Sequence, residues 1–472
     1  MSKREFIKYV KDVEVPIGIS RVDGRNLKMK TIENSKIKDL VADKITAGTL
    51  TGINSVIGSG NDIFKADLNG IYLGNAVFDS APFSVSMTGS LKAVNIGIAS
   101  VIVATATSKA KNGANYVCDG VDDQTEINSA ITDLGSVGGI VYLLEGTYII
   151  SNSIVLTSNI SLVGLGVATI IKLVNSSFSK RHLITNQDQT NGNSNIVIEN
   201  LKLDGNKSNQ DAANINHCIC FGKVSSTRIR NLLIENSNTG GISFQLDAND
   251  NNFIENNIIT ASRKAGITLS QSKRNTIRGN LISNCGDAGI KIIVSSNENT
   301  VLGNFCTSNN IGILLSDSTE NTIYGNNLQS NTLQGLTTDQ NVNRNLISNN
   351  VVFLNGRVGI YIWKGKENLV ANNYCHSNSQ SSDGGYANIY LVGDATYQAN
   401  YNIITGNICR KGSQTNKPSY GIALGNTDTV GNMIEGNDLY DSGVTGDLLD
   451  SGSGTLKRDN RNLAGTGWLT DV

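Results

Sequence analysis

The sequence predicts an all-β fold, a single-stranded parallel β-helix, and two recurring motifs lead to this prediction. The first motif, Asn-x-[Ile/Val]-x-x-Asn, is clearest in the copies that start at Asn252, Asn275, Asn299 and Asn321. The second motif, Gly-Ile-x-[Leu/Ile/Phe], occurs in copies that start at Gly241, Gly266, Gly289, Gly359 and Gly421. In both motifs apolar residues alternate with polar ones, and this period of two is typical of half-buried strands and not of helices.

The spacing of the first motif gives the length of one coil. Eleven copies, from Asn159 to Asn432, follow one another at intervals of 22 to 36 residues. Three short strands with Asn or Gly at the corners fit one interval, and successive coils should lie about 5 Å apart. One apolar column is expected inside the coils: Ile254, Ile277, Val301, Ile323, Ile347, Val370, Ile404 and Ile434. A column of corner asparagines is expected to bond from coil to coil: Asn257, Asn280, Asn304, Asn326, Asn350, Asn373, Asn407 and Asn437.

Composition and charge narrow the class of protein. The 472 residues include 39 Lys and Arg against 40 Asp and Glu, which argues against a nucleic-acid binder and against a membrane-surface protein. The N-terminus is too charged for a signal peptide and no apolar stretch is long enough to span a bilayer, so we expect synthesis in a cytoplasm and no membrane insertion. The seven cysteines include no C-x-x-C pair, so we expect buried free thiols and no zinc site.

Five segments are expected along the chain. Residues 1–57 are interpreted as an N-terminal oligomerisation segment, 58–100 as a small β module, 101–158 as a capping helix with the first coil, 159–446 as the β-helix, and 447–472 as a C-terminal tail. The helix is predicted from Ile127, Ala130, Ile131 and Leu134, which have helical spacing behind Asp122 or Asp123 as N-cap. Such a helix would cover the open apolar end of the coil stack.

The stretch from Asp119 to Tyr148, together with the coils behind it, resembles the pectate-lyase-like right-handed β-helix domains of bacteriophage tailspikes. Upstream, the segments 45–50, 62–74, 81–84 and 89–93 look like the N-terminal modules of phage tail proteins. The resemblance implies a homotrimer in the virion tail, attached to a tail or baseplate protein through a small N-terminal region, with residues 1–57 as the virion-attachment segment. It also implies that the β-helix binds, and often cleaves, a bacterial surface polysaccharide.

Candidate binding residues follow from the expected geometry, because the signatures of polygalacturonases, alginate epimerases and pectate lyases are incomplete or missing. Long corners at 205–216, 377–387 and 411–420 flank shorter coils and predict a groove along the second motif. Its column is Ser243, Thr268, Lys291, Leu314, Thr337, Tyr361 and Tyr390. Cations hold carboxylates and aromatic rings stack on sugars, so the candidates are Arg263, Lys264, Arg357, Tyr361, Trp363 and Tyr390. The alternative interpretation is a set of ordinary solvated strand positions.

Two pairs of residues are candidates for catalysis. Asp317 and Asp339 lie one coil apart, and one coil step brings them near the ~5 Å separation of the carboxylates in retaining glycosidases. Asp287 with Lys291 or Arg263 would instead supply the base and the charge neutraliser of a lyase.

Other titratable residues are assigned to structure. Glu298 and Glu320 belong to a column that alternates with arginines, which indicates a surface charge ladder. His182, His217 and His376 are assigned to packing or to the surface, on coils distant from one another. We therefore expect neither a metal nor another cofactor.

These observations together predict a phage tailspike that binds a bacterial surface polysaccharide and depolymerises it, with hydrolysis favoured over a lyase reaction. The first alternative is a non-catalytic receptor-binding or structural tail spike, which the missing signatures favour. The second alternative is a bacterial exported polysaccharide lyase or epimerase that shares only the fold.

Overall fold

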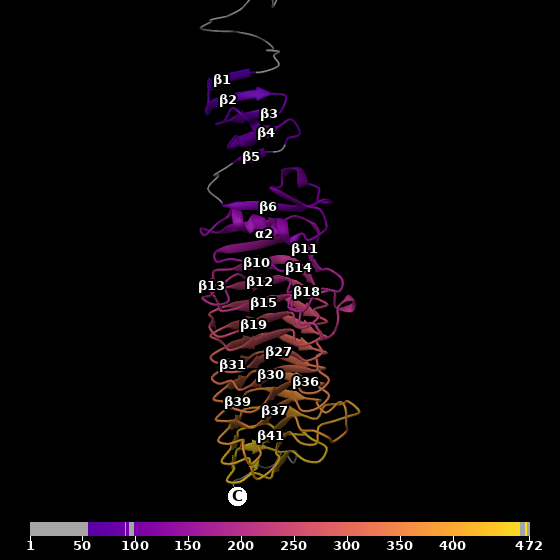
Figure 1. Ribbon diagram of the computed structural model, residues 1–472. Coiled ribbons are helices and arrows are strands. Elements are labelled where there is room, and N and C mark those ends of the chain that lie inside the picture. The colour runs from indigo at the N-terminus through magenta and orange to yellow at the C-terminus, as the bar shows by residue number, and fades with distance from the viewer. Residues whose placement is uncertain (1–54, 90, 94–98, 463–467, 470–472) are drawn as a thin grey trace, which may run out of the picture.

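The computed structural model describes residues 55–89, 91–93, 99–462 and 468–469, and Figure 1 shows a rod of stacked coils. The predicted helical oligomerisation segment lies almost entirely outside the described residues. Ahead of the rod, five antiparallel strands form a sheet in the order β1-β2-β3-β4-β5. They are β1 (Ser55–Ser59), β2 (Asp62–Asp67), β3 (Gly70–Leu73), β4 (Phe83–Ser86) and β5 (Leu91–Ala93).

Each regular coil contributes one strand to each of three faces, and every strand pairs in parallel with its counterparts in the neighbouring coils. Face 1 consists of β17 (Arg228–Arg230), β21 (Phe253–Glu255), β25 (Thr276–Arg278), β28 (Thr300–Leu302), β31 (Thr322–Tyr324), β35 (Leu346–Ser348), β39 (Leu369–Ala371), β42 (Ile403–Thr405), β45 (Met433–Glu435) and β47 (Leu456–Arg458). Face 2 consists of β18 (Leu233–Glu235), β22 (Ile258–Thr260), β26 (Leu281–Ser283), β29 (Phe305–Thr307), β32 (Asn327–Gln329), β36 (Val351–Phe353), β40 (Tyr374–His376) and β43 (Ile408–Arg410).

Face 3 is a sheet of twelve strands that runs the length of the rod. Its strands are β10 (Ile154–Leu156), β12 (Ile184–Asn186), β15 (Ile219–Gly222), β19 (Ile242–Gln245), β23 (Ile267–Ser270), β27 (Ala288–Ile293), β30 (Ile311–Ser316), β33 (Leu336–Thr338), β37 (Ile360–Trp363), β41 (Ile389–Val392), β44 (Ile422–Leu424) and β46 (Leu448–Asp450). In the first coils, β11 (Ile160–Leu173) and β14 (Val197–Asp204) run through both of the other faces. The fold is the predicted right-handed parallel β-helix.

Short strands lie at the corners and at the two ends of the rod. One corner carries β13 (Asn193–Ser194), β16 (Val224–Ser225), β20 (Asn249–Asp250) and β24 (Ser272–Lys273), followed by β34 (Val342–Asn343) and β38 (Gly365–Lys366). At the first coil lie β6 (Ser100–Thr105), β7 (Tyr116–Cys118), β8 (Gly139–Leu143) and β9 (Gly146–Ile150), and near the last coil lie β48 (Asn460–Arg461) and β49 (Trp468–Leu469). Single 3₁₀ turns occur at Phe78–Ser80, Lys111–Gly113 and Lys207–Asn209.

The core fills the inside of the coils. All eight residues of the predicted apolar column, from Ile254 to Ile434, are fully buried. The seven cysteines are buried and unpaired, as predicted. Burial raises the pKa of the thiols, for example of Cys285 to about 11, so these cysteines are protonated packing residues.

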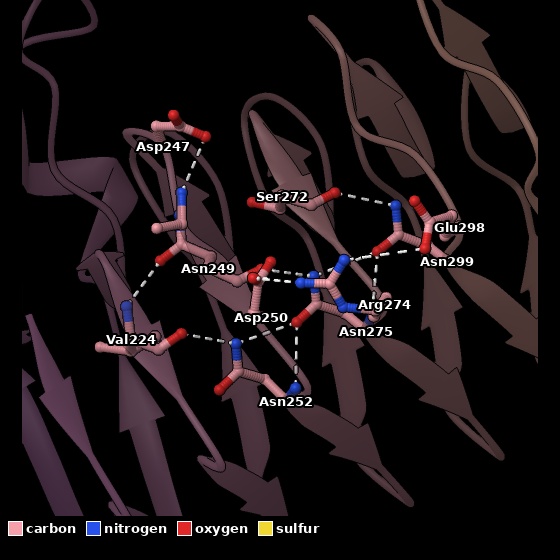
Figure 2. A network of polar contacts seen from close by, with 11 residues as sticks. Val224, Asp247, Asn249, Asp250, Asn252, Ser272, Arg274, Asn275, Glu298 and Asn299 are labelled. Carbon is pink, nitrogen blue, oxygen red and sulfur yellow. Dashed lines mark hydrogen bonds and ion pairs between the residues drawn. The ribbon is translucent and has the colours of Figure 1, made fainter.

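Asparagine ladders connect the coils at the corners, as predicted for the column that includes Asn257 and Asn280. The backbone and side-chain amides of Asn257 both donate to Oδ1 of Asn280 at 3.0 Å, and Asn280 donates in the same way to Asn304. Figure 2 shows a second ladder through Asn252 and Asn275. A third ladder runs through Asn309, Asn331, Asn355 and Asn378. Buried amides are thus satisfied by the next coil.

A helix closes the first end of the stack. It is α2 (Gln124–Asp133), and its buried residues include Ile127 and Ile131 (Figure 1). Asp123 is the N-cap residue, one of the two predicted, but its side chain makes no bond to the helix. Its buried carboxylate instead accepts the backbone N–H groups of Gly120, at 2.8 Å, and Ile149, at 2.7 Å. Asp123 therefore fastens the start of the helix to β9.

The coils continue beyond the predicted boundary at residue 446. Strand β46 pairs with β44, and β47 pairs with β45, so residues 447–461 form a further coil and not only a tail. The motif was missed because Lys457 occupies the position that is Ile434 one coil earlier. The Lys457 ammonium lies 2.8 Å from the Asp450 carboxylate, so an ion pair replaces apolar packing at this end of the stack.

Candidate functional site

The predicted column lies in register along face 3. Strand pairing aligns Ser243, Thr268, Lys291, Leu314, Thr337, Tyr361 and Tyr390 as direct neighbours from coil to coil. Ser243 and Thr337 are buried and the other members are half-buried. Tyr361 on β37 and Tyr390 on β41 are the aromatic members of the column, whose other members are Ser, Thr, Leu and the cation Lys291.

Three aromatic rings lie parallel on two neighbouring coils. The rings of Tyr361 and Tyr390 stack with centroids 5.5 Å apart and an interplanar angle of 7°. The ring of Trp363 lies 6.4 Å from that of Tyr361 at an angle of 4°, and it is 37% exposed. Burial, with a smaller contribution from Tyr390, raises the pKa of Tyr361 to about 12, so this phenol is neutral. We call Tyr361, Trp363 and Tyr390 the aromatic cluster.

Polar contacts fix the edge of the aromatic cluster. The hydroxyl of buried Thr338 accepts the Trp363 backbone N–H at 2.9 Å and lies 3.1 Å from the Trp363 carbonyl. The Lys364 ammonium lies 4.4 Å from the Trp363 ring centroid and 2.6 Å from the Asp394 carboxylate. The same ammonium lies 5.6 Å from the ring of Tyr397. Sequence inspection missed Lys364 and Tyr397, although Lys364 directly follows Trp363 and Tyr397 lies in a long corner.

The predicted cations divide into one structural residue and two exposed ones. Arg263 donates from Nε to the Asn238 side chain at 3.1 Å and from Nη2 to the Lys207 carbonyl at 3.3 Å, so it fastens the long corner at 205–216. Lys264 is exposed. Arg357 is also exposed, and its guanidinium lies 5.7 Å from the Tyr386 ring centroid, against the corner at 377–387.

Two of the residues predicted for a lyase reaction form an ion pair. The Lys291 ammonium and the Asp287 carboxylate form an ion pair at 2.8 Å on face 3. Asp317 and Asp339 instead have separate partners. Oδ1 of Asp317 accepts from the Asn341 amide at 2.7 Å, and Oδ2 of Asp339 accepts from the Ser316 hydroxyl at 3.4 Å. Asp339 directly follows Thr338, so it lies next to the edge of the aromatic cluster.

The predicted charge ladder is present at another corner of the rod. Arg274 bridges Asp250, at 2.6 Å, and Glu298, at 3.7 Å, as Figure 2 shows. Arg344 likewise bridges Glu320, at 3.0 Å, and Glu367, at 3.8 Å. Glu298 and Glu320 are therefore members of surface ion pairs.

Two of the histidines lie together, which corrects the expectation that all three are scattered. The rings of His182 and His217 are 5.3 Å apart, because the coil between them is 35 residues long. Backbone N–H groups donate to Nδ1 of both rings, from His217 to His182 and from Gly240 to His217, each at 3.1 Å. Nδ1 is thus an acceptor and the proton resides on Nε2. Burial lowers the pKa of His182 to about 4 and that of His217 to about 3.

Other groups that resemble metal ligands serve the fold. Within the described residues, one cluster of such groups has its ligand atoms mutually within 4.8 Å, and it consists of Cys118, Asp123 and Glu126. Both oxygens of Asp123 already accept backbone N–H groups, and burial raises the pKa of Cys118. No helix of the described residues is long and apolar enough to cross a membrane.

Solved structures with similar folds include enzymes and phage proteins. The A-module of the mannuronan C-5 epimerase AlgE6 from Azotobacter vinelandii matches with a TM-score of 0.61 and 22% identity, over 71% of this chain and 96% of that one. The Dettilon tailspike protein matches at 0.50 and 17%, over 69% and 64%. The catalytic unit of a GH87 α-1,3-glucanase from Streptomyces thermodiastaticus matches at 0.52 and 14%, over 71% and 67%. At these identities the likeness concerns the fold.

Sequence comparison adds a family. No curated protein shows significant similarity to the chain. A family model described as periplasmic copper-binding protein (NosD) matches residues 145–343 and 293–385, which together span just over half of the chain. The matched region covers the coils from β9 to the corner that follows β40. Because the family model matches more than half of its length, the chain belongs to the NosD family.

Proposed function

We propose that this protein is a phage tailspike whose face 3 binds a bacterial surface polysaccharide. The observation that carries the proposal is the aromatic cluster: the stacked, parallel rings of Tyr361 and Tyr390 on neighbouring coils, with the partly exposed ring of Trp363 beside them. The edges and outer faces of these rings offer apolar surface on which a sugar can pack. The similar folds of the Dettilon tailspike and of the GH87 glucanase support the proposal.

Depolymerisation is the second part of the proposal. Asp317 and Asp339 are the proposed acid and base of a hydrolase, and Asp339 follows the residue that holds Trp363. In the same surface, the Asp287–Lys291 pair is the corresponding candidate for a lyase. The missing catalytic signatures favour the alternative of a spike that binds without cleaving, so both outcomes enter the test.

The attachment of the spike completes the proposal. The N-terminal region would join a tail or baseplate protein, and the chains would assemble as a homotrimer in the virion tail. The five-stranded sheet ahead of the rod supports this arrangement, because it provides a module of its own between residues 1–54 and the coils.

Copper binding, which the family name includes, does not fit the residues of this chain. Copper is bound by imidazole nitrogens and by thiolates. Nδ1 of both His182 and His217 accepts a backbone N–H, so Nε2 carries the proton and is closed to a metal. Cys375 and Cys409 are register neighbours, but both lie fully buried inside the coils and burial raises their pKa. We therefore derive no step through copper.

The test measures binding and chain length separately. Tyr361→Ala and Trp363→Ala should weaken binding of host capsule or wall glycan at least about tenfold, because the sugar rings lose the aromatic surface on which they pack. Tyr142→Ala on β8 is the matched control, because Tyr142 has the same 37% exposure as Trp363 but lies at the first coil. Unchanged binding in all three variants would refute the glycan site.

The catalytic part is tested with Asp317→Asn and Asp339→Asn on the same glycan. Loss of chain shortening with binding retained would support hydrolysis. Products with an unsaturated sugar end, abolished by Asp287→Asn, would support the lyase instead. Glycan that is bound but never shortened by the wild type would leave the non-catalytic spike as the function.

A further inference from the structure

Face 2 carries an apolar stripe on its outer side. Strand pairing aligns the first residue of each of its strands from coil to coil: Leu233, Ile258, Leu281, Phe305, Asn327, Val351, Tyr374 and Ile408. Seven of these eight residues are apolar or aromatic, although the position points outward. Ile258, Leu281, Tyr374 and Ile408 are 39% to 47% exposed. An outward strand position on a solvated sheet is ordinarily polar.

Neighbouring columns widen the stripe. Across the Asn corner, Leu302 and Tyr324 on face 1 are 36% and 43% exposed. On the other side, the rings of Phe353 and His376 stack 4.9 Å apart, and Tyr374 lies 4.7 Å from His376. The apolar surface is thus wider at the middle coils, where Asn327 is the one polar member of the stripe, and an exposed apolar patch of this kind marks an interaction surface.

Charged residues border the stripe and are already paired within the chain. Near its first end, Arg230 pairs with Glu199 at 2.5 Å and Arg278 pairs with Glu255 at 2.6 Å. At its last end, Arg410 pairs with Asp438 at 2.6 Å. An apolar centre with a neutralised polar rim is the composition of a protein–protein interface, not of a glycan site, where hydroxyl groups need hydrogen-bond partners.

We propose that the apolar stripe is the surface through which copies of this chain pack against one another. Eight coils at about 4.8 Å give a length of roughly 38 Å, and three outward columns give a width of about 20 Å. The resulting area of roughly 750 Å² per copy is close to the ~800 Å² that each partner contributes to a standard stable interface.

A second copy fits this surface better than another partner does. The stripe repeats one position at the coil spacing over eight coils, and a second rod offers apolar side chains with the same repeat. The inference gives a location to the self-association that the proposed function includes. It leaves face 3, with the aromatic cluster, outside the interface, so glycan binding and assembly are tested by different variants.

The experiment measures the mass of the full-length protein in solution by sedimentation or light scattering. The wild type should have a multiple of 50.2 kDa. Leu281→Lys and Tyr374→Lys place an ammonium in the centre of the stripe and should weaken self-association at least about tenfold. Leu165→Lys is the matched control, because Leu165 is 55% exposed outside the stripe, and it should keep the wild-type mass.

A folding control and two possible results decide whether the proposal holds. Circular dichroism must show intact β structure in all three variants, which is expected because the substituted side chains are exposed. A monomeric wild type overturns the proposal, whether the stripe is then bare or covered by residues 1–54 of the same chain. An oligomer that all three variants retain also overturns it, because the contact must then lie elsewhere.

Discussion

Replacing Asn350 by glycine tests whether the asparagine ladders stabilise the rod. Asn350 is fully buried, and its Oδ1 accepts the backbone N–H of Asn326 at 2.9 Å and its side-chain amide at 3.0 Å. Its own Nδ2 donates to the Ile323 carbonyl at 3.0 Å and to Asn373 at 2.9 Å. Glycine removes all four bonds and leaves the buried N–H of Asn326 without this acceptor.

The expected loss is large for one polar side chain. An unsatisfied buried donor costs about 1–3 kcal/mol, and each of the three further bonds contributes ~1 kcal/mol net, so Asn350→Gly should lower the free energy of unfolding by about 4–6 kcal/mol. The adjacent Asn349 provides the matched control. It is exposed and has a φ of 56°, a conformation that glycine adopts freely, so Asn349→Gly should change stability by less than about 0.5 kcal/mol.

Urea denaturation followed by circular dichroism and by tryptophan emission measures both variants. Trp363 follows Asn350 within the same coil, so its emission reports on the affected part of the rod. Hydrogen exchange at the Asn326 amide adds a local measurement, since that amide should exchange faster only in Asn350→Gly. Two variants within about 1 kcal/mol of each other, with unchanged exchange at Asn326, would refute the reasoning.

Three further predictions concern pH, the aromatic cluster and the cap. His182 and His217 have a pKa of about 4 and about 3 in the fold against 6.5 unfolded, so the unfolded chain binds more protons below pH 6.5. The free energy of unfolding should therefore fall from pH 6.5 towards pH 4, by ~2 kcal/mol per histidine at pH 5. A variant with both His182→Gln and His217→Gln should lack this loss when its thermal unfolding is measured over the same pH range. Gly425→Ala places a Cβ 2.1 Å from Oη of Tyr390, so the ring must leave its stack, and glycan titration should show weaker binding by a folded protein. Asp123→Ala removes a buried carboxylate that accepts two hydrogen bonds and should lower the free energy of unfolding by about 3–5 kcal/mol. Urea denaturation measures this loss, and Asp123→Asn should lose an intermediate amount.

The regular part of the fold could be predicted from the sequence because each coil repeats the same physical requirement. An apolar residue at the position of Ile277 and an amide at that of Asn280 are needed in every coil, so the period is visible without coordinates. The third asparagine ladder, through Asn309 and Asn331, was missed because it covers only a few coils. The last coil was also missed, because Lys457 stands where the first motif has an apolar residue in every earlier coil, such as Ile434.

The candidate site was less predictable, because it depends on contacts between corners of different length. The column of Tyr361 and Tyr390 followed from the repeat, whereas the contacts of Arg263 depend on a corner 56 residues away in sequence. The pairing of His182 with His217 was missed for a related reason. The coil between them is 35 residues long, and neither histidine lies in one of the two motifs that define the register of the coils.

The regularity of the rod also bears on how the aromatic cluster would bind a ligand. Tyr361 and Tyr390 are held on adjacent strands, and neither coil can shift without breaking asparagine ladder bonds such as those between Asn373 and Asn407. The 5.5 Å separation of the rings is therefore set by the scaffold before any ligand arrives. A surface ordered in advance loses little conformational entropy on binding. Binding at this cluster should consequently leave the backbone unchanged, and widespread changes in hydrogen exchange on face 3 upon glycan addition would contradict this view of the site.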